Sequence, residues 1–237
     1  MEQTQSFKRS SELKRISKQQ LSGKWGAVVL LVFVFWIISM TSAVPYVGAF
    51  VHLIIGGALL LGLKSCFVKI VRGEEFELEN LFSGFKNLGS SILVQLLIGI
   101  FIFLWGLLAI IPFVVLIIVS IKNDGGIGTA VGAVTAIACI ILSIPAIIAG
   151  YRYSMAYYIL NDHPDVGSYE SIVQSKQMMK GYKWKLFCLH LSFIGWFILG
   201  IISIGIGFLW IAPYYQTANA NFYEELKNIQ ESNMQLE

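Results

Sequence analysis

The chain has 237 residues, of which 56% are hydrophobic and 13% charged, and its formal net charge is +3. A soluble domain carries about 25% charged residues because its surface is solvated, so this composition excludes an ordinary soluble protein. The apolar residues form long uninterrupted blocks, and about 20 such residues cross the roughly 30 Å of hydrocarbon in a bilayer. The sequence therefore predicts an all-α, polytopic transmembrane helical bundle.

The N-terminal segment, residues 1–24, is polar and basic, and the first apolar block follows at about residues 25–44. We expect residues 1–24 to be a solvated cytoplasmic arm that fixes orientation. Leu13, Ile16 and Leu21 leave open a short amphipathic helix on the membrane surface. Small residues near the end of the first block resemble a signal-peptide cleavage site, but the apolar run is longer than a signal peptide needs. The block is therefore predicted to be an uncleaved span.

A second apolar block covers about residues 47–68, and a charged stretch follows it. Within that stretch Leu78, Leu81, Phe82 and Phe85 fall on one helical face. We expect a short amphipathic helix there, lying on the cytoplasmic surface of the membrane or on the bundle itself.

The third and fourth blocks are longer than one span requires. Residues 90–121 would form a straight helix about 48 Å long at 1.5 Å per residue, so the block must tilt, kink at Pro112 or emerge from the membrane. The fourth block, residues 127–160, contains Pro145. It ends in a tyrosine-rich part, which is typical of a helix at the headgroup level.

The last apolar block, residues 186–215, is interrupted by glycines and by Pro213, and we divide it near Ser203–Gly207. Cytoplasmic flanks carry excess Lys and Arg. Placing the basic segments inside gives six spans with both termini cytoplasmic, or five spans with the C-terminus outside if the last block does not divide. The predicted spans are about 25–44, 47–68, 90–112, 127–160, 186–203 and 207–224, in one domain of residues 25–226 with a polar tail at 227–237.

Several motifs, in a fixed order, resemble a known family. They are the run Pro145–Leu160 (PAIIAGYRYSMAYYIL) with Asn161-Asp162-His163-Pro164, then Met179-Lys180-Gly181, Lys183-Trp184-Lys185, Leu191–Trp196, Gly205–Trp210 with Pro213-Tyr214, and Phe222-Tyr223. In this order they resemble an uncharacterised family of bacterial integral membrane proteins, numbered nine-seven-five among the domains of unknown function. The resemblance covers roughly residues 20–226. It implies a multi-span plasma-membrane protein of Gram-positive-type bacteria and no established activity. The chain departs from the family between Pro112 and Pro145, where a long apolar stretch intervenes.

Catalytic and metal-binding patterns are missing from the sequence. The apolar blocks contain no Asp or Glu, whereas proton-coupled transporters and metal-dependent membrane enzymes need carboxylates. His52, His163 and His190 have no metal-ligand spacing, and no glycine-rich phosphate loop occurs. We read Cys66 and the other two cysteines as small buried hydrophobes without a disulfide. We therefore expect no catalytic residue, no metal and no cofactor.

A few polar side chains inside the apolar blocks are candidate binding residues. Lys64 and Arg152 lie near predicted cytoplasmic ends, where a long side chain can reach the headgroups as a simple anchor. Alternatively, Arg152 forms a groove for an anionic lipid headgroup or a peptide with tyrosines such as Tyr153 and Tyr157, because a guanidinium binds phosphate in a bidentate manner. His190 is either part of this site or a donor in an interhelical hydrogen bond.

Three functions are compatible with these features. The first is a non-enzymatic protein of the bacterial cytoplasmic membrane that binds lipid or a membrane partner, such as an accessory or protective factor. The second is a transporter or lipid-moving protein with its site between two half-repeats, based on Phe103-Leu104-Trp105 before Pro112 and Phe208-Leu209-Trp210 before Pro213. The third is a membrane enzyme that uses surface acids. The expected partners are membrane lipids, a membrane protein or a second copy of the chain, and not nucleic acid.

Overall fold

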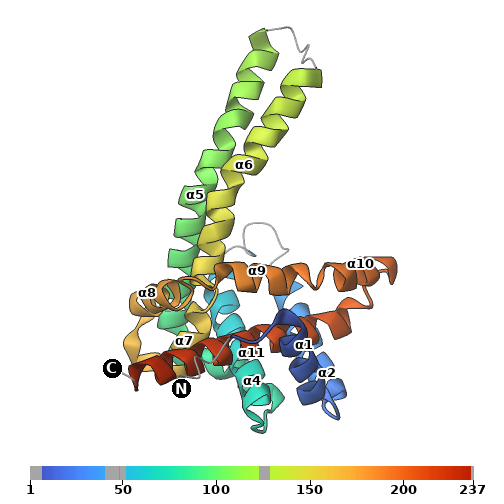
Figure 1. Cartoon of the computed structure of the whole chain (residues 1–237), viewed down its shortest axis with the longest axis vertical. Coiled ribbons are helices and arrows are strands. Elements are labelled where there is room, and N and C mark those ends of the chain that lie inside the picture. Colours follow the sequence, from blue (N-terminus) through green and yellow to red (C-terminus); the bar gives the residue numbers. More distant parts are fainter. Residues whose placement is uncertain (1–6, 41–47, 49–51, 123–128, 236–237) are drawn as a thin grey trace, which may run out of the picture.

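The computed structural model describes residues 7–40, 48, 52–122 and 129–235, and these residues fold into helices joined by short turns. Figure 1 shows two parts, a helical body and a long hairpin that rises from it. The elements are α1 (Ser10–Leu21), α2 (Trp25–Met40), η2 (His52–Gly56), α4 (Gly57–Arg72), the 3-10 helix η3 (Leu78–Asn87), α5 (Leu88–Lys122), α6 (Thr129–Tyr153), α7 (Ala156–Asp162), η4 (Pro164–Val166), α8 (Ser168–Met178), α9 (Lys183–Leu191), α10 (Ile194–Ile202) and α11 (Phe208–Met234).

The long hairpin consists of α5 and α6, and both proline residues of these helices lie inside continuous helix. The base of α5 packs into the body, where Val94 is buried and the Phe101 ring lies 5.6 Å from the Tyr153 ring. Beyond Phe101 on α5, and before Ala149 on α6, none of the described side chains is buried. About 20 residues of each helix therefore project from the body, roughly 30 Å at 1.5 Å per residue. That length equals one hydrocarbon core, so each leg suits a single crossing.

The first residues of the third apolar block belong to the body, which leaves about 20 residues of the block for the crossing itself. Length and composition identify four described stretches that could cross a membrane: Leu53–Arg72, Leu78–Ile121, Val131–Asp162 and Lys183–Ile202. A fifth is obtained if α1 and α2, which meet at 101°, form one broken span. Six spans are not shown.

The last apolar block does divide where the sequence indicated, since α10 ends at Ile202 and α11 begins at Phe208. The part of α11 that was predicted as a sixth span is not a candidate crossing. After Tyr215 polar residues alternate with apolar ones, and Thr217, Asn221 and other polar side chains there are buried within the body.

Residues 10–21 are a packed helix and not a solvated arm, which corrects the sequence-based expectation for this segment. Leu13 and Leu21 are buried, and Ser17 between them is fully enclosed. The Asn221 amide of α11 donates to Ser17 Oγ at 3.0 Å. The apolar stripe of α1 therefore packs on its own bundle, and only the opposite basic face remains exposed.

The amphipathic segment after α4 forms η3, as a 3-10 helix that starts with a capping box between Glu77 and Asn80. Leu81 is buried against α4. Contact is close because both helices use glycine: a Cβ at Gly62 would lie 1.9 Å from the Leu81 carbonyl oxygen, and one at Gly84 would lie 2.0 Å from that of Ala58. Because α4 carries Lys64, this contact also fixes the position of the candidate site.

The main hydrophobic core lies in the body, among α1, α2, α4, α7, α9 and α11, and its largest enclosed side chains include Tyr158, Tyr223, Phe67 and Phe222. Cys66 is buried there, whereas the other two cysteines are half-buried, and all three are free thiols. The cysteines are thus unpaired as expected, although only one is fully enclosed.

Candidate functional site

A polar cluster surrounds Lys64, in the middle of α4. Its Nζ donates a hydrogen bond to Gln216 Oε1 of α11 at 2.8 Å. The same ammonium group lies 4.9 Å from the ring centroid of Tyr158 on α7, within range of a cation–π interaction. Lys64 itself is half-buried. One helix thus supplies the cation, and two others supply its neutral partners.

His190 of α9 extends this cluster. Its Nε2 lies 2.8 Å from Asn219 Oδ1, and its ring lies 5.5 Å from the Tyr151 ring and 5.0 Å from the Tyr215 ring. Asn219 Nδ2 donates to the Tyr215 backbone carbonyl at 2.7 Å, which orients the amide. Oδ1 of Asn219 is therefore the acceptor, and His190 Nε2–H is the donor. We call Lys64, Tyr151, Tyr158, His190, Tyr215, Gln216 and Asn219 the Lys64 cluster.

The Lys64 cluster has a positive charge without an anion. Among the residues described, no carboxylate forms an ion pair with Lys64, and every ion pair involves Lys8, Arg72 or Lys227. The hydroxyl of Tyr158 is buried and has no hydrogen-bond partner in this part of the chain. A half-buried cation with only neutral partners and a buried hydroxyl without a described hydrogen-bond partner are both unfavourable, so the cluster favours binding of an anionic acceptor.

A second polar network, at the C-terminal end of α4, is by contrast neutral. Arg72 Nη2 contacts Asp162 Oδ2 at 2.5 Å and Glu224 Oε1 at 2.7 Å, and Lys227 Nζ donates to Asp162 Oδ2 at 2.7 Å. Tyr223 donates to the same Asp162 oxygen at 3.1 Å. Burial, followed by the adjacent Asp162 carboxylate, raises the pKa of Tyr223, so its phenol stays protonated as the donor. Two cations and two anions balance here.

Asp162 is therefore an enclosed carboxylate and not a solvated one. Its side chain is only 3% exposed, because Arg72 and Lys227 enclose it. The network touches the Lys64 cluster through a stacked pair of rings, Tyr158 and Tyr223, with centroids 5.0 Å apart.

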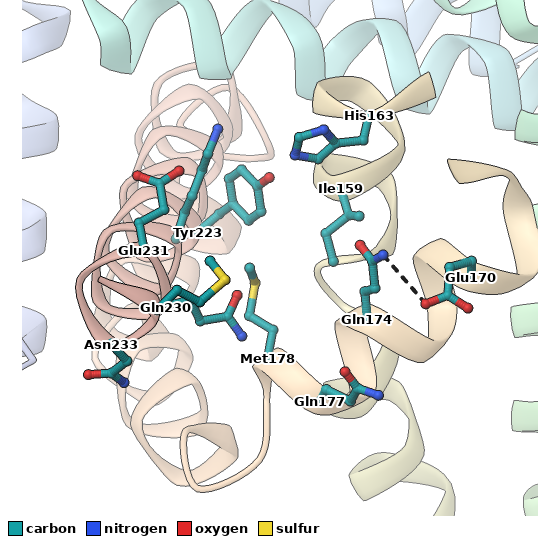
Figure 2. A pocket seen from close by; sticks show the side chains of 12 residues that line it. Ile159, His163, Glu170, Gln174, Gln177, Met178, Tyr223, Gln230, Glu231 and Asn233 are labelled. Carbon is teal, nitrogen blue, oxygen red and sulfur yellow. Dashed lines mark hydrogen bonds between the residues drawn. The ribbon is translucent and has the colours of Figure 1, made fainter. Parts of the chain in front are cut away.

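An open groove of about 580 Å³ lies between α7, α8 and α11 (Figure 2). Glu170, Gln174 and Gln177 of α8 line one side, and Gln230 and Glu231 of α11 line the other. Gln174 Nε2 donates to Glu170 at 3.4 Å. Within the described ranges, no group of three or more His, Cys, Asp or Glu side chains is placed to hold a metal ion.

The structure divides the five residues that the sequence singled out. Lys64 and His190 belong to the same cluster. Tyr153 and Tyr157 meet in a separate apolar cluster beside α5 and α8, where Tyr153 packs on Phe101 and the buried Tyr157 hydroxyl has no described partner. The Arg152 side chain is half-buried and forms no hydrogen bond or ion pair with the part of the chain that is described.

Sequence reasoning did not single out Tyr215, Gln216 and Asn219. A signal was present, because Gln216 and Asn219 are amides three residues apart and therefore share one face of the last helix. The partners of that face, Lys64 of α4 and His190 of α9, could not be read from the spacing.

Residues 1–230 match the family described as Protein of unknown function (DUF975). No curated protein and no solved structure matches the chain.

Proposed function

The chain belongs to the DUF975 family, a membrane protein family of unknown function, and from the Lys64 cluster we propose that it binds an anionic lipid headgroup without being an enzyme. The observation that carries the proposal is the Lys64 ammonium, which has neutral partners but no anionic one among the described residues. We place the protein in the bacterial cytoplasmic membrane with its N-terminus in the cytoplasm, as the distribution of basic residues favours.

A lipid is the anion that fits the position of Lys64. The residue lies half-buried within Leu53–Arg72, one of the stretches that could cross a membrane by length and composition. A charge in such a stretch is costly unless it is paired or contacts a headgroup. The Lys64 ammonium is a hydrogen-bond donor, as phosphate oxygens require.

Aromatic rings around the donors favour the same ligand. Tyr151 and Tyr215 flank His190, and Phe193 packs edge-on against Tyr215 at 5.4 Å. Aromatic side chains with one polar end are favoured where headgroups meet hydrocarbon. The cluster thus offers polar donors to a phosphate, beside apolar surface suited to the adjoining glycerol and acyl carbons.

The test compares lipid-dependent stability in the purified protein. We expect phosphatidylglycerol, and not phosphatidylcholine, to raise the thermal unfolding midpoint in detergent, with a stabilisation of about 2.7 kcal/mol at one hundred times Kd. Lys64→Met should abolish the difference between the two lipids. Lys180→Met, which removes an exposed lysine, is the matched control and should keep it.

Stability without added lipid separates a binding role from a structural one. Lys64→Met should then unfold at or above the wild-type temperature, because a cation without an anion has been removed. A full phosphatidylglycerol effect in Lys64→Met, or a large loss of stability without lipid, would contradict the proposal.

A further inference from the structure

The turn between α10 and α11 is an apolar tip that projects from the body (Figure 1). Its isoleucines are the most exposed in this region: Ile201 is 69%, Ile202 71%, Ile204 93% and Ile206 62% exposed. Residues 193–215 contain no charged side chain. A contiguous apolar surface of this kind indicates contact with protein or membrane and not with water.

The backbone N–H groups of the tip all have partners within the tip or α10. Each N–H from Ser203 to Leu209 donates to an oxygen of the tip or of α10, including Gly205 N to the Gly200 carbonyl at 3.0 Å. Gly207 N is bonded to Ser203 Oγ at 2.8 Å, and that hydroxyl donates to the Gly200 carbonyl. A turn in water does not need internal hydrogen bonds, because water satisfies exposed amides. In hydrocarbon, backbone amides must be bonded within the protein.

Ile204 supports the same environment. Its φ is +55°, in the left-handed region that β-branched residues rarely occupy, and it is the one described non-glycine residue with a positive φ. A β-branched residue is unfavourable in this backbone conformation, and placing one at the most exposed point of a turn would add no stability in water. It gives the tip a large apolar side chain where acyl chains surround it.

The hairpin is too short on its return side to cross a bilayer. From Phe208 to Tyr215 about eight residues are apolar, roughly 12 Å at 1.5 Å per residue, against roughly 30 Å of hydrocarbon. The next residue, Gln216, is already bonded to Lys64, and Thr217 is buried in the body. The tip is therefore held near the side of the membrane on which α11 rejoins the body.

The direction of the helices agrees with this. Figure 1 shows α9–α10 and α11 running across the direction of the α5–α6 hairpin. If α5 and α6 cross the bilayer, α10 and the start of α11 lie largely along its plane. We propose that residues 194–215 form a shallow re-entrant membrane hairpin, which lies largely along the membrane plane with both ends on the same face and Ile201–Ile206 among the acyl chains. This inference does not depend on the headgroup site.

Cysteine accessibility in cells tests the proposal. The full chain, with Cys66, Cys139 and Cys188 replaced by serine, would carry Ile204→Cys and be treated with a membrane-impermeant maleimide, in intact cells and in inside-out vesicles. Lys180→Cys, an exposed position next to α9, is the control and should react from one side only. Ile204→Cys should react from neither side, and fully after denaturation in detergent.

Two outcomes would overturn the re-entrant hairpin. Reaction of Ile204→Cys from the side opposite to Lys180→Cys would show that the hairpin crosses the membrane. Reaction from the same side would show that the tip lies in water. Ile206→Cys provides a second position, so that a folding defect at residue 204 does not decide the result.

Discussion

Replacing Gly84 by alanine should separate η3 from α4 and destabilise the body that holds the Lys64 cluster. The new Cβ would lie 2.0 Å from the Ala58 carbonyl oxygen and 3.0 Å from the Gly62 nitrogen. Both neighbours are backbone atoms, so neither can rotate away. Since a carbon–oxygen contact needs about 3.3 Å, the two helices must move apart by roughly 1.3 Å.

That displacement opens the packing around Leu81, which is fully enclosed against α4. Overpacking costs typically 1–3 kcal/mol when side chains can adjust, and here a loss of at least about 3 kcal/mol is expected because they cannot. At roughly 2–4 °C per kcal/mol for a chain of this size, the thermal unfolding midpoint should fall by about 6–12 °C.

Gly89→Ala is the matched control, because a Cβ at Gly89 meets nothing within 4 Å and its helical position favours alanine by about 0.5–1 kcal/mol. Thermal unfolding of the two purified variants in the same detergent gives the comparison. If Gly84→Ala melts with Gly89→Ala, at or above the wild-type temperature, the close contact of η3 with α4 is refuted.

Three further predictions concern charge, polarity and the hairpin. Asp162→Asn removes one of the two anions beside Arg72 and the carboxylate partner of Lys227, so it should lower the free energy of unfolding by about 2 kcal/mol. This loss is below the roughly 3–5 kcal/mol of a fully buried pair because both cations are partly exposed. A chemical denaturation curve like that of the wild type would contradict the prediction. Asn219→Leu removes the acceptor of His190 Nε2–H, and should lower stability by about 1–3 kcal/mol, measured by the same denaturation. Ile111→Lys places a charge about halfway along the part of α5 that projects from the body. It should make membrane insertion less favourable by about 2.5–3.5 kcal/mol in a glycosylation-based insertion assay. A smaller cost at residue 111 than for Ile121→Lys, at the end of the helix, would argue against a crossing hairpin.

The apolar hairpin could be predicted from sequence because its environment is uniform. Exposed apolar side chains such as Ile140 lie on every side of the hairpin helices, so composition alone indicates a lipid environment. It is not necessary to know which helices contact one another. The break near Ser203–Gly207 was predictable for a similar reason, since glycine and proline act locally.

The packing of α1 and the charge network could not be predicted in the same way. A prediction that uses only neighbouring residues classes α1 as polar, because its basic residues outnumber those of its short apolar stripe. Only the position of α11 shows that Leu13 and Leu21 are enclosed. Likewise, Asp162 is enclosed by Arg72 from α4, 90 residues earlier in the chain. Burial of such groups is a tertiary property, decided by which helices meet.

The two charged regions of the body differ in a way that bears on function. At the end of α4, Arg72 has two carboxylate partners, whereas Lys64, about two turns earlier on the same helix, has none among the described residues. If the role of Lys64 were only to stabilise the fold, a neutral side chain would do as well at lower cost in desolvation. A cation beside this neutral network instead supports our proposal that the anion comes from outside the chain, as the headgroup of a membrane lipid.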